Sequence, residues 1–116
     1  MFNGKSQTVG GKSHAEGSKN IAFENNSHAE GNETFAAGKH SHAEGNGSSA
    51  LEDASHSEGT GSVAKSQSAH AEGNGSIAEG EGAHAEGSAT RTIGLAAHAE
   101  GEATQAFNKG THAEGY

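Results

Sequence analysis

Small residues alternate with polar or variable residues in two short stretches of this chain, and the arrangement recurs every fourteen residues. Residues 69–82 read AHAEGNGSIAEGEG, with Ala, Ala and Gly at alternate positions of the first half and Ser, Ala and Gly in the second. Alternation of period two is typical of a β-strand with one face turned inward. Each unit is therefore predicted to hold two five-residue strands, each followed by a short turn.

Turn-forming dipeptides follow the first stretch at matching places in three units. They are Asn46-Gly47, Thr60-Gly61 and Asn74-Gly75. Glycine tolerates the left-handed backbone that tight turns need, and asparagine favours turns as well. These dipeptides agree with a strand–turn–strand–turn unit.

The period does not vary along the chain. Eight histidines occupy positions 14, 28, 42, 56, 70, 84, 98 and 112, and each opens a His-Ala-Glu-Gly tetrad, except that His56 opens His-Ser-Glu-Gly. A strict short period predicts a solenoid whose coils stack in register. The expected fold class is all-β, a parallel β-roll or β-solenoid with one coil per fourteen residues. Eight coils at roughly 4.8 Å each would extend about 35–40 Å.

The amino-acid composition argues against a helical structure with the same period. Fourteen residues equal two heptads, but the recurring residues are Ala, Ser, His, Glu and Gly rather than the large apolar residues of a coiled-coil seam. The 19 glycines would also destabilise a helix. Disorder, which so few large apolar residues would suggest, does not explain the unbroken register.

The composition limits the partners and the chemistry. There is no cysteine, which rules out disulfides and thiolate metal sites, and no proline to interrupt backbone ladders. The net charge of −8 disfavours nucleic acid as a partner. No signal peptide or apolar membrane-spanning run is visible, so we expect no direct membrane insertion.

Alternation along the strands predicts which side chains face outward. Ala71 and its equivalents face inward, so His70 and Glu72, on either side of it, share the outer face. The second strand is predicted to send in Ser or Thr and Ala, and its outward positions vary. Those positions are Ile21, Phe35, Ser49, Val63, Ile77, Arg91 and Gln105, and Phe23, Ala37, Leu51, Lys65, Glu79, Ile93 and Phe107.

The repeat resembles the YadA-like head repeat of trimeric autotransporter adhesins. That family has a fourteen-residue pattern close to S-V-A-I-G-x-x-S-x-A-x-G-x-x, and this chain carries S-H-A-E-G at 13–17, 27–31 and 41–45 and S-I-A-E-G at 76–80. The likeness spans about Ser6 to Gly115 and extends to repeats of phage tail and prophage surface proteins. It implies a left-handed β-roll and a homotrimer around a threefold axis. In the family Val and Ile face that axis, whereas this chain has His and Glu there.

The resemblance therefore assigns the polar rows to the trimer axis, as structural pairs between chains and as candidate metal ligands. The rows are His14, Glu16, His28, Glu30, His42, Glu44, His56, Glu58, His70, Glu72, His84, Glu86, His98, Glu100, His112 and Glu114. If Glu pairs with His across chains, the pKa of the histidines is expected to be raised. If the histidines are instead buried neutral or bind metal, the sign of the pH dependence reverses and acid would dissociate the trimer. The glycines after each Glu are predicted to end the first strand, with a positive φ or the close approach of a neighbouring chain. They are Gly17, Gly31, Gly45, Gly59, Gly73, Gly87, Gly101 and Gly115.

The leading hypothesis is a structural segment of a trimeric surface or phage tail fibre that spaces or presents a binding module. It treats residues 1–116 as one repeat domain, a fragment of a longer fibre, with 1–5 an N-terminal extension for which disorder is one expectation. The expected location is the extracellular surface or a virion, and the expected partners are the chain itself and a host-surface or carbohydrate receptor. No cofactor is expected.

Three other function classes make distinct demands on the sequence. In a metal-ion-binding module, the His–Glu rows would hold a divalent metal, or an anion would lie on the threefold axis. An ice- or polysaccharide-binding solenoid would need a flat threonine ladder, but threonine recurs at one position only as Thr34, Thr90 and Thr104. An enzyme is not expected, because every candidate catalytic residue is repeated and Ser13 and His14 face opposite ways.

Overall fold

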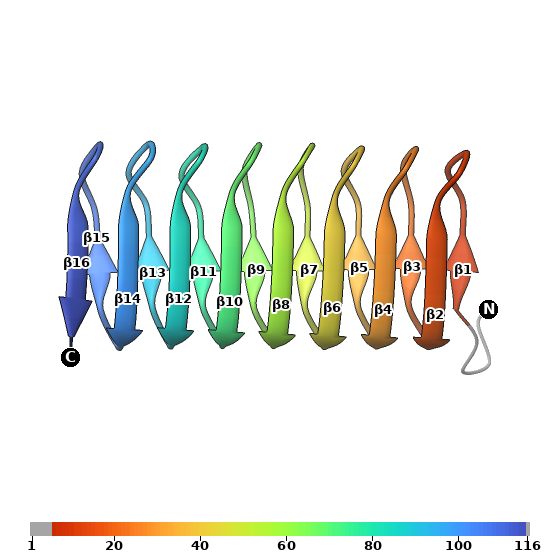
Figure 1. Cartoon of the computed structure of the whole chain (residues 1–116), viewed down its shortest axis with the longest axis horizontal. Coiled ribbons are helices and arrows are strands. Elements are labelled where there is room, and N and C mark those ends of the chain that lie inside the picture. Colours follow the sequence, from red (N-terminus) through yellow and green to blue (C-terminus); the bar gives the residue numbers. More distant parts are fainter. Residues whose placement is uncertain (1–5, 116) are drawn as a thin grey trace.

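The computed structural model describes residues 6–115 and shows a parallel β-solenoid with no helix in that range. The proposed extension at 1–5 lies outside the described residues. Each coil contributes one long and one short strand (Figure 1). The long strands are β2 (His14–Ser18), β4 (His28–Asn32), β6 (His42–Asn46), β8 (His56–Thr60), β10 (His70–Asn74), β12 (His84–Ser88), β14 (His98–Glu102) and β16 (His112–Gly115). The short strands are β1 (Gln7–Thr8), β3 (Ile21–Ala22), β5 (Phe35–Ala36), β7 (Ser49–Ala50), β9 (Val63–Ala64), β11 (Ile77–Ala78), β13 (Arg91–Thr92) and β15 (Gln105–Ala106).

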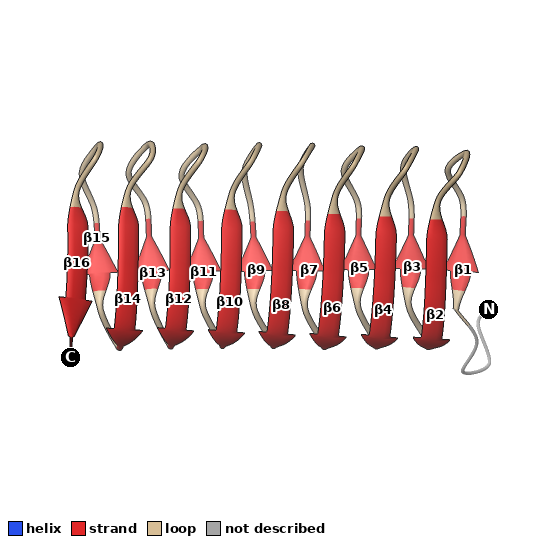
Figure 2. Ribbon diagram, in the orientation of Figure 1, coloured by secondary structure: helices blue, strands red, loops and turns tan. Residues whose placement is uncertain are grey.

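The strands form two parallel sheets, which confirms the predicted all-β solenoid of about eight coils. All long strands pair in one 8-stranded sheet from β2 to β16, and all short strands pair in a second from β1 to β15. The two sheets lie as separate layers along the long axis (Figure 2). Each residue pairs with its equivalent in the next coil, as His70 does with His84. The molecule measures 40 × 21 × 16 Å, and its length agrees with stacked coils at strand spacing.

The second strand is shorter than the five residues predicted from the sequence. In β11 it comprises Ile77 and Ala78 alone. A turn begins at Gly80, where the amide of Ala83 donates a hydrogen bond of 3.0 Å to the Gly80 carbonyl oxygen. The alternation of small residues continues into this turn because Gly80 also lies against the backbone of the next coil. A Cβ there would come within 2.1 Å of the Gly94 oxygen.

The interior is as narrow as the small residues predict. The buried apolar residues within the described chain are all alanines, such as Ala71 and Ala78, each 0% exposed. Most buried hydroxyls donate to backbone carbonyls, although the buried Thr92 hydroxyl has no hydrogen-bond partner. Ser48, Ser62 and Ser76 donate hydrogen bonds of 3.0–3.1 Å to the carbonyl oxygens of glycines in the following coil. Serine is therefore tolerated inside because its hydroxyl has a fixed acceptor.

The turn after each long strand requires a left-handed residue. Gly47, Gly61 and Gly75 have φ of +73°, +66° and +70° at this place. Ala89 and Ala103 occupy the equivalent place in later coils with φ of +58° and +56°. Because alanine avoids this conformation in isolation, stacking of the coils imposes the turn.

The solvent-accessible surface area of the molecule is typical of a globular protein of its mass. It is 5755 Å², which is close to the value of about 5800 Å² expected for a globular protein of this mass. The unusual property of the fold is therefore the chemistry of its interior, methyl groups and hydroxyls in place of large apolar side chains. Within residues 6–115 no helix is long and apolar enough to span a membrane.

Candidate functional site

The outer side of the long-strand sheet carries the repeated histidines and glutamates, and we call it the His–Glu face. In β10, His70 and Glu72 are half-buried on this side while Ala71 between them is buried in the core. Parallel pairing in register places His70 beside His56 and His84, and Glu72 beside Glu58 and Glu86. The face therefore consists of one column of imidazoles and one column of carboxylates, as the alternation predicted.

The imidazoles stack along the solenoid. From His28 to His98, neighbouring ring centroids are 4.5–4.8 Å apart and the ring planes differ by 3–12°. The outermost rings depart from this order, since His14 meets His28 edge-on at 65°. Side chains from His28 to His98 remain 34–38% exposed. The stack is thus a continuous, half-exposed stripe.

The carboxylates flank the Nε2 atoms of these rings. Within each coil, Nε2 lies 3.6–4.0 Å from a glutamate oxygen two residues away. Four histidines also lie 3.6–3.8 Å from the glutamate of the preceding coil. They are His42, His84, His98 and His112. The glutamate column therefore contacts histidines of two coils, and it does so at distances too long for hydrogen bonds.

Most Nε2 atoms are covered although the rings are partly exposed. In His28, His42, His56, His70, His84 and His98, Nε2 is buried and has no hydrogen-bond partner. A buried polar atom without a partner is unfavourable and marks a place where another group can bind. Three-residue groups such as His28, Glu30 and His42, or His84, Glu86 and His98, have nitrogen and oxygen atoms within 4.8 Å of one another. These groups have the donor types of a transition-metal site.

Two histidines of the His–Glu face have lowered pKa values in the single chain, which is the sign expected for imidazoles that are buried neutral. Burial, followed by the neighbouring His84 and His56, lowers the pKa of His70 to about 4. Burial also lowers the pKa of His84, although Glu86 opposes this shift. Within the single chain, desolvation and like neighbours outweigh the nearby carboxylates at these two residues. At neutral pH their contacts with glutamates are therefore contacts of neutral imidazoles.

The glutamates influence each other through the same stacking. Hydrogen bonding with Glu72 and Glu100 lowers the pKa of Glu86 to about 2. Hydrogen bonding with Glu86 and Glu114 raises the pKa of Glu100. The opposite directions indicate that neighbouring carboxyl groups of the column titrate together, as expected where like charges are close. The fourteen-residue period contains this signal, since it places Glu above Glu, but the direction of each shift does not follow from the period.

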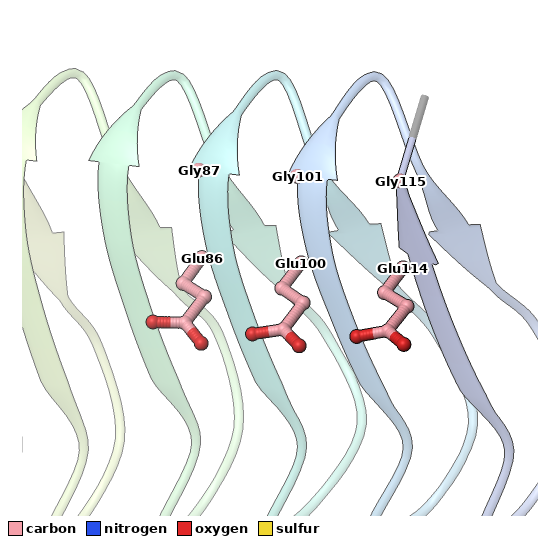
Figure 3. A pocket seen from close by; sticks show the side chains of 6 residues that line it. All are labelled: Glu86, Gly87, Glu100, Gly101, Glu114 and Gly115. Atoms are coloured by element: carbon pink, nitrogen blue, oxygen red, sulfur yellow. The ribbon is translucent and has the colours of Figure 1, made fainter.

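An open trough runs along the C-terminal end of the face. It is lined by Glu86, Gly87, Glu100, Gly101, Glu114 and Gly115. Figure 3 shows the three carboxylates in a row, one from each coil and all directed to the same side. The glycines have no side chain, so the trough stays open beside the carboxylates.

The backbone also explains why a glycine follows each glutamate of the His–Glu face. The eight glycines have φ between +108° and +117°. A Cβ at Gly73 would lie 2.0 Å from the carbonyl oxygen of Gly87 in the next coil. The prediction that the strand ends at this glycine was wrong by one residue, because β10 continues to Asn74.

The outward positions of the short-strand sheet do not form a comparable site. Phe23 and Phe35 pack edge to face with ring centroids 6.4 Å apart. Phe23, Ile93 and Phe107 are 46%, 38% and 54% exposed. Arg91 and Glu79 form an ion pair on the same side. The mixture of aromatic, aliphatic and charged residues agrees with the variability predicted for this side.

No protein-family model matches the chain, and no curated protein sequence matches it either.

Proposed function

We propose that the chain is a structural segment of a trimeric surface or phage tail fibre, built of left-handed coils like the YadA-like head repeats that its sequence resembles. Its role is to space or present a binding module, and it catalyses no reaction. The observation that carries the proposal is the unbroken register of the His–Glu face over all coils. A repeating face of this kind is complementary to copies of itself at every level along the axis.

The chemistry of the interior supports self-association. The core clusters contain alanines only, and each cluster extends over a few coils. A methyl group buries little apolar area, so a single solenoid gains less from burial than a domain with large apolar side chains. Three copies around an axis would bury the half-exposed imidazoles.

The dimensions suit a spacer. The solenoid is about twice as long as it is wide, at 40 × 21 × 16 Å, and adding coils lengthens it without changing its cross-section. In this proposal the outward residues of the short-strand sheet and the turns face solvent. A host-surface or carbohydrate receptor would be contacted there or through a neighbouring module.

Single cysteines test which face lies on the axis, because the chain contains no cysteine of its own. Glu72→Cys places a thiol on the His–Glu face, and the matched control Ser49→Cys places one outward on the short-strand sheet. Disulfides form only where Cα atoms approach within about 7 Å. After oxidation we expect a covalent dimer from Glu72→Cys on a non-reducing gel, with the third thiol of each trimer left free, and no dimer from Ser49→Cys. A dimer from the control alone, or from neither variant, would contradict the proposed arrangement.

A further inference from the structure

We propose that the C-terminal end of the His–Glu face binds divalent transition-metal ions, one at His98 and one at His112, each held by the histidine and the two carboxylates beside it. All ligands come from one chain. The proposal therefore goes beyond the structural role and does not depend on association of the chains.

The distances around His98 fit such a site. Its Nε2 is 3.6 Å from Glu86 Oε1 and 3.8 Å from Glu100 Oε2. Metal–nitrogen bonds of about 2.0–2.1 Å and metal–oxygen bonds of about 2.0–2.2 Å would span these separations with angles of roughly 120–130° at the ion. Such angles leave room for further ligands such as water.

The site at His112 shares a ligand with the first. His112 Nε2 is 3.8 Å from Glu100 Oε1 and 3.7 Å from Glu114 Oε2. Glu100 thus presents Oε2 to one histidine and Oε1 to the next. A carboxylate in this position bridges two ions, and its loss would weaken both sites together.

The stacking excludes two histidines on one ion. The rings of His84 and His98 are 4.7 Å apart and nearly parallel, at 3°. Their nitrogen lone pairs therefore point in the same direction and do not converge. Two metal–nitrogen bonds also join nitrogens at most about 4.2 Å apart. The ring centroids of His84 and His98 are 4.7 Å apart. One imidazole with two carboxylates is the ligand set that the face supplies without rearrangement.

Nε2 of His98 is buried and has no hydrogen-bond partner, as is true of five other histidines in the column, so it is available as a ligand atom. One further feature singles out the C-terminal end. The trough lined by Glu86, Glu100 and Glu114 opens beside the carboxylates and gives an ion and its waters access. His42 and His84 also lie between two carboxylates, at 3.7–3.9 Å. No glutamate beside His42 lines this trough, and of the two beside His84 only Glu86 does.

Electrostatics favours a cation here. Like charges directly opposite each other on neighbouring strands are destabilising, and the glutamate column places one carboxyl above another in every coil. An ion shared between neighbouring carboxylates would offset that repulsion. Mixed imidazole and carboxylate donors suit Zn²⁺ and other first-row divalent ions.

Zinc titration of the full chain by calorimetry, after removal of metal with a chelator, tests the proposal. Glu100→Gln removes the shared carboxylate and keeps its shape. Glu81→Gln is the matched control, since it removes the same charge from an exposed turn. We expect the unaltered chain and Glu81→Gln to bind Zn²⁺ alike, and Glu100→Gln to bind at least about tenfold more weakly, since even loss of an outer-shell partner has an effect of that size.

Equal binding by Glu100→Gln and the unaltered chain would overturn the proposal, as would a loss in Glu81→Gln as large as in Glu100→Gln. Absence of Zn²⁺ binding by the unaltered chain up to about millimolar concentration, where binding energies are near 4 kcal/mol, would overturn it as well. Circular dichroism of each variant checks that the solenoid is intact. The number of chains per particle is measured separately, so failure here leaves the structural proposal standing.

Discussion

At the scale of single residues, the glycine column shows how the backbone restricts the sequence. Gly73 has φ of +108°, and a side chain there would meet the Gly87 oxygen at 2.0 Å. Gly75, two residues later, has φ of +70°, and a Cβ there would meet no atom within 4 Å. The first glycine is therefore required by both conformation and contact, and the second by conformation alone.

Exchanging each of these glycines for alanine separates the two requirements. We expect Gly75→Ala to lower the free energy of unfolding by about 1 kcal/mol, the cost of a left-handed alanine. Gly73→Ala should lower it by about 3 kcal/mol, because the coils must also move apart. Urea unfolding of both variants measures the difference. Equal losses, or a smaller loss for Gly73→Ala, would mean that the contact with Gly87 does not restrict the site.

The sequence predicted these glycines only in part. Their recurrence indicated either a positive φ or the close approach of a neighbouring chain. The positive φ is confirmed, and the close contact is made by the next coil of the same chain, which was not predicted. The left-handed alanines, such as Ala89 at φ +58°, could not be predicted, because alanine has no local preference for that conformation. Stacking against the coils on either side decides it.

At the scale of elements, alternation was enough to predict which residues face inward and which face outward. Ala71 is buried, and His70 and Glu72 lie outward, because side chains alternate along any strand. Strand length was not predictable, because small residues are required in two places. They face the interior of a strand, and they are also needed in a turn that lies against the next coil, as at Gly80. The sign of the histidine pKa shifts was not predictable either, because it depends on the balance of burial and neighbouring charges.

The lowered histidine pKa predicts that acid destabilises the solenoid. With a folded pKa near 4 and an unfolded value near 6.5, the unfolded chain binds more protons at His70 between these limits. The stability contributed by neutral His70 is therefore complete above about pH 6.5 and is lost as pH falls toward 4. The groups that face His70 are His56, His84, Glu58, Glu72 and Glu86.

Urea unfolding at several pH values from 4 to 7.5, with a chelator present, measures this dependence. His70→Gln, which cannot titrate, should show a smaller loss of stability between pH 6.5 and 4 than the unaltered chain. An unaltered chain that becomes more stable on acidification would show instead that pairing with glutamate dominates. The same slope in both proteins would mean that His70 does not contribute.

At the scale of the whole molecule, the solenoid combines an ordinary surface area with an interior of methyl groups and hydroxyls. Its half-exposed imidazoles and closely spaced carboxylates lie on one flat side. Association through that side would bury the imidazoles and leave the variable short-strand side in solvent. The sequence predicted the solenoid and its long axis because both follow from the period. The number of chains does not follow from the period, because it depends on surfaces that different copies present to each other.

The mass of the particle in solution tests the central claim most directly. Light scattering coupled to size-exclusion chromatography, at neutral pH with a chelator present, should give three times the mass of one chain. Circular dichroism of the same fraction should show β-structure. A particle with the mass of a single chain and the same β-rich spectrum at all concentrations would contradict the account, because the solenoid would then be stable without a partner.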